Sequence, residues 1–138
     1  MRYGVGCMLY SVLSMDGNKI KSFTDLNVWK EGHELVLMVY ETTKDFPAEE
    51  RFGLRDQIRR AVTSITNNIA EGFSRVSSKE KAKFYFTALG SLTEVQNQLL
   101  IARDLKYISQ KTFAEIAQQT LVVKKLLRGL IKSAKLMP

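Results

Sequence analysis

The sequence contains very few of the residues from which most catalytic and metal sites are built. Among 138 residues there is one cysteine, Cys7, and one histidine, His33. A zinc site needs three or four ligands, a di-iron bundle needs Glu-x-x-His motifs, and a Cys–His pair would need Cys7 anchored against a helix. A glycine loop of the phosphate-cradling type is also missing. We therefore expect no enzyme activity, no metal and no cofactor.

Helix breakers and long apolar runs are scarce as well. The two prolines are Pro47 and Pro138, and four of the eight glycines precede residue 35, so residues 50–138 can support long helices. No run of about 18 apolar residues occurs, which argues against a membrane-spanning helix. A single cysteine cannot form an intramolecular disulfide, and we therefore expect a cytoplasmic setting.

The N-terminal segment differs from the rest of the chain. Its mildly apolar stretch, residues 5–15, is interrupted by a glycine and two serines, and no small-residue cleavage site follows. We expect residues 1–22 to be a loose extension rather than a signal peptide, with Met15 as a candidate for the real start. Residues 23–138 are expected to form one domain, because that length suits a single core.

Four helices are predicted from apolar residues that recur at alternating steps of three and four. The first is expected to begin at an N-cap, Asp25, and to end near Lys44. The second is expected to start after Pro47, with an irregular turn at Gly53, and to fade over residues 72–76. The third is expected to begin with a capping box at Ser77 and Glu80 and to end near Leu105, and the fourth to begin at a cap, Ser109. Short connections favour neighbours of opposite direction. The expected fold is thus an all-α, antiparallel up-down-up-down four-helix bundle.

The first and last helices have the clearest predicted core faces. On the first, the expected face comprises Leu26, Trp29, His33, Val36, Tyr40 and Thr43, widened by Leu35 and Val39. On the last, it comprises Phe113, Ile116, Thr120, Val123, Leu127, Leu130 and Ala134.

Few residues remain as candidates for chemistry. His33 lies between Gly32 and Glu34 rather than among basic residues, so we expect a partly buried histidine that is hydrogen-bonded inside the bundle, not a phosphotransfer site. A metal-dependent RNA-processing enzyme is kept as an alternative that would need inward carboxylates. Its candidates are Asp56, Glu71 and Glu94.

A polar border runs beside the apolar face of the second predicted helix. Polar groups there need partners, because an unpaired buried polar group costs about 1–3 kcal/mol. We expect a structural hydrogen-bond network that sets the helix register, and a ligand or RNA site is the alternative. The expected members are Arg60, Ser64, Asn68 (or its neighbour Asn67), Glu71 and Glu94, with Arg103 as a further charge partner.

Several short motifs occur together along residues 23–94. They are Phe23-x-Asp25-Leu26-x-Val28-Trp29, Phe46-Pro47-x-x-Glu50-Arg51-Phe52-Gly53-Leu54, Gln57-Ile58-Arg59-Arg60-Ala61, Asn68-Ile69-Ala70-Glu71-Gly72-Phe73 and Ala88-Leu89-Gly90-Ser91-Leu92-x-Glu94. In this combination the chain resembles the 23S rRNA intervening-sequence proteins, also called the four-helix bundle protein family, over about residues 23–130.

The resemblance implies a left-handed up-down bundle that assembles as a ring, usually a homopentamer. It also implies genes sited in insertions within rRNA, and a distant likeness to accessory proteins of diversity-generating retroelements, which bind nucleic acid and a reverse transcriptase. It implies no known activity.

Two basic stripes are the remaining functional signal in a chain whose formal net charge is +7. Residues three or four apart share a helix face, and such faces contact phosphates when they are basic. The first stripe is Arg51, Arg55 and Arg59, and the second is Lys124, Arg128, Lys132 and Lys135. Solvated charged faces are the alternative reading.

The leading hypothesis is therefore a non-enzymatic, homo-oligomeric module that binds RNA or another nucleic acid through these stripes. The alternative is a protein–protein interaction scaffold or accessory subunit with no nucleic-acid role. In that case apolar residues outside the seam would make subunit or partner contacts, namely Leu121, Val122 and Ile131. No small-molecule substrate and no membrane partner is expected.

Overall fold

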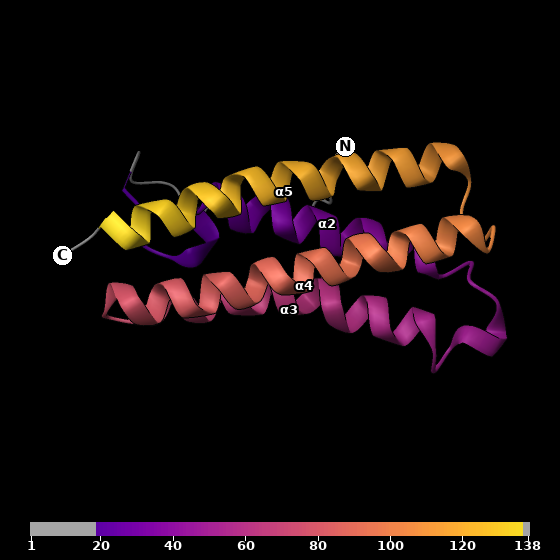
Figure 1. Ribbon diagram of the computed structural model, residues 1–138, viewed down its shortest axis with the longest axis horizontal. Coiled ribbons are helices and arrows are strands. Elements are labelled where there is room, and N and C mark those ends of the chain that lie inside the picture. The colour runs from indigo at the N-terminus through magenta and orange to yellow at the C-terminus, as the bar shows by residue number, and fades with distance from the viewer. Residues whose placement is uncertain (1–18, 137–138) are drawn as a thin grey trace.

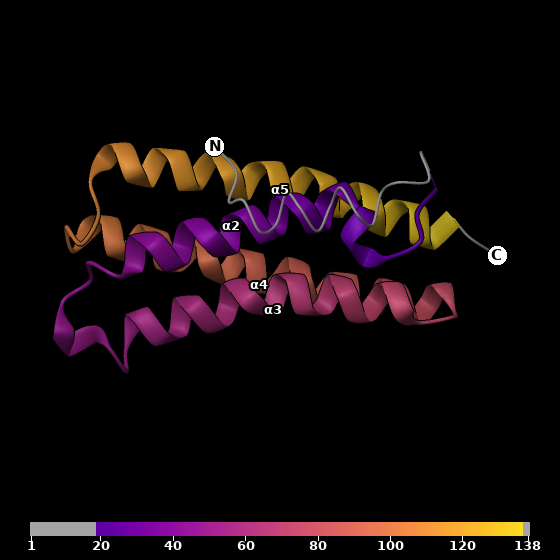
Figure 2. The ribbon, with the colours of Figure 1, turned by 180° about the vertical axis from the view of Figure 1, so that it is seen from behind.

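Four long helices make up most of residues 19–136, the part of the chain that the computed structural model describes. The elements are η1 (Phe23–Asp25), α2 (Asn27–Thr43), η2 (Ala48–Glu50), α3 (Leu54–Ser74), α4 (Ser78–Asp104) and α5 (Gln110–Leu136). The helices lie side by side along the long axis of the molecule (Figure 1), and Figure 2 shows the same packing from behind. With no strand in that range, the prediction of an all-α four-helix bundle is confirmed.

The helix ends follow local capping chemistry. The Oγ of Ser77 accepts a hydrogen bond from the Glu80 amide at 3.1 Å, and the Oγ of Ser109 accepts one from the Thr112 amide at 3.1 Å. Ser77 and Ser109 are thereby confirmed as N-caps. Of the capping box predicted at Ser77 and Glu80, the structure shows the bond to the Glu80 amide. Gly53 has φ −108° and ψ −116°, which confirms the irregular entry to α3.

The start of the first helix was predicted wrongly. Asp25 is not an N-cap of α2, which begins two residues later at Asn27. Instead, its Oδ2 accepts hydrogen bonds from the amides of Lys21 at 2.9 Å and Ser22 at 3.1 Å. Because the carboxylate is directed backward, it closes the 3-10 turn η1 and ties two residues of the expected extension to the bundle. Residues 1–18 of that extension, with Cys7 and Met15, lie outside the described residues.

The main core is a large cluster to which every long helix contributes. Its most deeply buried large side chains are Leu35, Ile58, Ile65, Ile69, Leu92, Leu99, Ile116 and Leu127. Burying aliphatic side chains of this size stabilises the fold by roughly 1.5–3 kcal/mol each. The packing of these helix faces against one another is therefore the main source of stability.

Two predicted core positions are displaced around the helix. On α2 the buried face is centred on Leu35 and Val39, whereas Tyr40 is 37% exposed. On α5 the buried residue is Ile131, and Leu130 is only half-buried. A heptad pattern does not distinguish adjacent residues at the border of a seam, and the actual neighbours decide which of them faces inward.

Contacts between successive helices pair residues in opposite chain order. The Oγ atoms of Ser64 on α3 and Ser91 on α4 lie 2.8 Å apart, and Gly72, later in α3, approaches Tyr85, earlier in α4. The Nε2 of Gln96 donates to the Oγ1 of Thr120 on α5 at 3.1 Å. The left-handed twist implied by the family resemblance stays a prediction.

Glu50 joins three segments at one end of the bundle. Its Oε1 accepts the Leu54 amide at 3.0 Å, at the start of α3, and its Oε2 accepts the hydroxyl of Tyr107 at 2.8 Å, in the turn between α4 and α5. The hydrogen bonds from the Leu54 amide and then from Tyr107 lower the pKa of Glu50. The same contact with Glu50 raises the pKa of Tyr107.

Candidate nucleic-acid interface

A groove with a basic rim runs between α4 and the C-terminal half of α5. It has a volume of about 520 Å³ and is lined by Phe86, Leu89, Arg128, Ile131, Lys132 and Lys135. None of these six residues is acidic. We call this feature the basic groove.

Helix geometry explains why the cations gather there. Arg128, Lys132 and Lys135 are spaced by four and three residues, so they share one face of α5. Of the three, Lys135 lies in the last turn of α5, where the helix dipole favours positive charge. The structure therefore brings together three of the four residues of the second predicted stripe. The fourth, Lys124, is half-buried one turn earlier and is not among the lining residues.

Phe86 supplies an aromatic surface inside the basic groove. Its side chain is 46% exposed, and the Nζ of Lys135 lies 4.8 Å from the ring centroid. The sequence interpretation did not single out this residue. One feature of the sequence could have indicated its exposure. Phe86 follows Phe84 by two residues, and side chains at that spacing point to different sides of a helix.

An uncharged region lies further along the same pair of helices. A second hollow there is lined by Gln96, Leu99, Leu100, Phe113, Ala117, Thr120 and Leu121. Leu121 is 53% exposed and Leu100 is 41% exposed. Glu94 is the single charged residue between positions 84 and 102 of α4. We call this feature the apolar hollow.

The first predicted arginine stripe is not a continuous helix face. Arg51 precedes α3, which begins at Leu54, so the predicted spacing along one helix is wrong for this residue. Arg51 is exposed and lies 5.3 Å from the ring centroid of Phe52, and Arg55 is half-buried.

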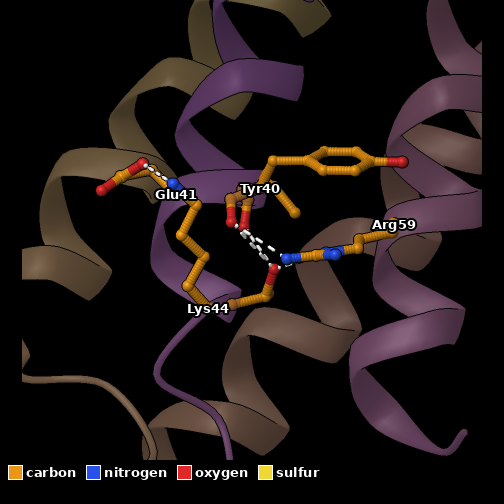
Figure 3. Close-up of polar contacts among 6 residues, drawn as sticks. Tyr40, Glu41, Lys44 and Arg59 are labelled. Carbon is orange, nitrogen blue, oxygen red and sulfur yellow. Dashed lines mark hydrogen bonds and ion pairs between the residues drawn. The ribbon is translucent and has the colours of Figure 1, made fainter. Parts of the chain in front are cut away.

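Arg59, the third member of that stripe, connects α3 to the end of α2 (Figure 3). Its Nε donates to the Oγ1 of Thr43 at 2.8 Å, and its Nη2 donates to the carbonyl of Tyr40 at 3.2 Å. The guanidinium also lies 4.5 Å from the centroid of the Tyr40 ring. With these contacts, Arg59 satisfies the C-terminal end of α2 and is not a freely projecting phosphate ligand.

The predicted polar network is divided between several contacts. The Nδ2 of Asn68 donates to the Ser64 carbonyl at 2.8 Å and to the Ser64 Oγ at 3.1 Å. The Ser64 Oγ in turn contacts Ser91 across the α3–α4 interface at 2.8 Å. These three residues form a compact interhelical cluster.

The remaining members of that set make separate contacts within their own helices. Arg60 pairs with Asp56 at 3.1 Å, Glu71 with Arg75 at 3.8 Å, and Glu94 accepts from Gln98 at 3.2 Å. Arg103 pairs with the adjacent Asp104 at 2.9 Å. The three carboxylates considered for a metal-dependent enzyme are thus each engaged with a different neighbour. Within residues 19–136, no group of three or more His, Cys, Asp and Glu is placed to hold a metal ion.

His33 is half-buried and stacks on Trp29, with ring centroids 4.8 Å apart and planes inclined by 15°. Desolvation by this packing lowers the pKa of His33, against a smaller opposing effect of Glu34. The imidazole therefore packs as an aromatic surface.

Among the described helices, none has the length and apolar character required to cross a membrane.

Comparisons with protein families and with solved structures each found a match. The family model for the 23S rRNA-intervening sequence protein matches residues 24–129. Among solved structures, the chain is similar to a protein with unknown function from the S23 ribosomal protein family of Bacteroides thetaiotaomicron VPI-5482. The two share 25% identity with a TM-score of 0.71, over 76% of this chain and 95% of that chain. No curated protein matches the chain. The chain belongs to the 23S rRNA-intervening sequence protein family.

Proposed function

We propose that this protein acts by binding nucleic acid at the basic groove, without catalysing a reaction. The observation that carries the proposal is the convergence of Arg128, Lys132 and Lys135 around the exposed ring of Phe86, with no acidic residue in the lining. Clustered cations of this kind attract the phosphate backbone and release its counterions. RNA is the first ligand to test, because the family is defined in relation to rRNA.

The groove is a better candidate than the first arginine stripe. Arg59 would have to break two hydrogen bonds and a ring contact before it could reach a phosphate. Arg51 and Arg55 alone form a smaller positive surface, close to the carboxylates of Glu49 and Glu50 in η2. Binding is therefore expected to depend mainly on α5.

The test compares two double variants that remove equal charge from the same helix. Arg128→Gln/Lys132→Gln removes two cations from the basic groove. Lys111→Gln/Lys125→Gln removes two exposed cations of α5 that do not line it. The ligand is a short labelled RNA, and its affinity is measured by fluorescence anisotropy at several salt concentrations.

Wild-type affinity is expected to fall about 20- to 40-fold between 50 and 200 mM salt if three phosphates are contacted. In the groove variant, the negative slope of log affinity against log salt should become shallower by about 1.4–1.8, because two phosphate contacts are lost. The control variant should keep most of the slope. Equal losses in both variants, or no binding at 50 mM salt, would contradict the proposal.

A second candidate function, a protein-interaction scaffold, is favoured by the apolar hollow. Exposed Leu100, within the nearly uncharged stretch of α4, and exposed Leu121, on α5, line the hollow, and such surfaces commonly form protein contacts. Of the residues expected for this role, Leu121 is exposed and Val122 is half-buried, but Ile131 belongs to the core. We propose that the hollow contacts further copies of the chain, so that a homo-oligomer presents several basic grooves.

A further inference from the structure

We infer that the basic groove selects single-stranded over double-stranded nucleic acid, by stacking an unpaired base on Phe86. This inference rests on the proposed nucleic-acid function and specifies its ligand. The ring of Phe86 on α4 is half-exposed, and the cations that line the same groove come from α5. Phenylalanine offers no hydrogen bond, so its contribution to binding would be stacking that tolerates any base.

Duplexes present a different surface. In a duplex each base face is covered by its neighbours, and the protein meets phosphates and groove edges. The half-exposed ring of Phe86 can stack on a base face only when that face is not covered by a neighbouring base, as in an unpaired strand. The three cations could hold either form through phosphates, whereas Phe86 adds affinity for the single strand alone.

Lys135 contacts the ring face on which a base would stack. The ammonium lies 4.8 Å from the ring centroid, and both residues are exposed. An exposed cation–π contact of this kind is weaker than stacking of a nucleobase on an aromatic ring. A base can therefore displace Lys135, whose flexible side chain then reaches a neighbouring phosphate.

The spacing of the cations suits a short length of strand. Arg128 and Lys135 are seven residues apart on α5, or about 10 Å along the helix axis. Over this distance the cations can contact neighbouring phosphates of a short, flexible strand. One stacked base with flanking phosphates would fill the groove.

The test measures one labelled RNA strand alone and annealed to its complement, in about 50 mM salt where phosphate binding is strong. Phe86→Ala removes the stacking surface, and Phe86→Trp enlarges it. The matched control is Phe52→Ala, which removes a ring that is 84% exposed beside Arg51 but lies outside the basic groove.

Wild type is expected to bind the single strand more tightly than the duplex. Phe86→Ala should weaken single-strand binding about tenfold and leave duplex binding unchanged, because stacking on one base contributes about that factor. Phe86→Trp should bind at least as tightly as wild type, and Phe52→Ala should match it.

The outcomes separate the two proposals. If wild type binds both forms equally and Phe86→Ala changes neither, single-strand selection is wrong while the nucleic-acid function stands. A loss with Phe52→Ala instead would place the stacking site at the other end of the bundle and overturn the inference. Absence of binding to either RNA form would overturn both proposals.

Discussion

At the scale of single residues, Gly72 shows how one position sets the distance between two helices. A Cβ atom at this position would lie 2.6 Å from the Cε1 and 2.9 Å from the Cδ1 of Tyr85, and 3.0 Å from the Cβ of Phe84. Tyr85 is buried, so its ring cannot move aside. The glycine of the Asn68–Phe73 motif thus has a physical role: it allows α4 to pack closely against the end of α3.

Gly72→Ala is expected to destabilise the protein by about 1–3 kcal/mol, because the added methyl group overpacks the α3–α4 contact. The measurement is urea unfolding followed by circular dichroism. The control is Gly129→Ala on α5, where a Cβ would meet nothing within 4 Å. It should stabilise by about 0.5–1 kcal/mol through helix propensity. Equal stability of Gly72→Ala and wild type would show that the helices can separate without loss.

At the scale of elements, specific side-chain contacts hold the helix ends in register. Arg59 joins α3 to the last turn of α2, and Glu50 joins the start of α3 to the α4–α5 turn through Tyr107. A small apolar cluster of Phe46, Leu54 and Ala102 lies at the same end. This end of the bundle therefore depends on specific polar contacts in addition to apolar packing.

Glu50 is expected to make stability depend on pH under acid conditions. Because folding lowers the pKa of Glu50, its contribution is present above the unfolded value and is lost as the pH falls through the folded value. Wild type should therefore lose stability as the pH is lowered below about 4.5.

Glu50→Gln should lose less stability than wild type between pH 5 and pH 3.5, since it lacks this titration. Urea midpoints at the two pH values measure the difference. Glu115→Gln, at an exposed position of α5, serves as the control and should follow wild type. If Glu50→Gln and wild type lose the same stability, the Leu54 and Tyr107 contacts do not contribute in solution.

At the scale of the whole molecule, α4 and α5 carry two surfaces of different chemistry on one side of the bundle. The apolar hollow lies toward the α4–α5 turn, and the basic groove lies toward the C-terminal end of α5. Such a division allows subunits to associate through one surface while the other stays available to a ligand. Repeating the groove in each subunit would also increase binding through multivalency.

Leu121→Glu is expected to dissociate the proposed oligomer, because it places a charge in the apolar hollow. Size-exclusion chromatography with light scattering should give a mass well above the 15.7 kDa chain for wild type and a value near it for the variant. Gln118→Glu, at an exposed position of α5 that does not line the hollow, should not change the mass. The same measurement on wild type tests the pentamer implied by the family resemblance. A monomeric wild type would contradict the oligomer proposal.

Much of the fold could be predicted because its signals are local. The apolar face of α3 and the caps at Ser77 and Ser109 depend on residues within one or two helical turns. The misplaced cap at Asp25 shows the limit of such signals, since the same side chain can cap a 3-10 turn instead of the helix that follows. Of the candidate site, the periodicity of Arg128, Lys132 and Lys135 was visible in the sequence.

The sequence by itself therefore determined the number and approximate extent of the helices, the family to which the chain belongs, and the cationic face of α5. Only the tertiary structure decided that Phe86 of α4 lies beside that face, that Arg59 is engaged with α2, and that Ile131 is buried. The physical reason is that helix periodicity specifies which residues share a face, whereas the neighbour of that face depends on how residues far apart in the chain pack together.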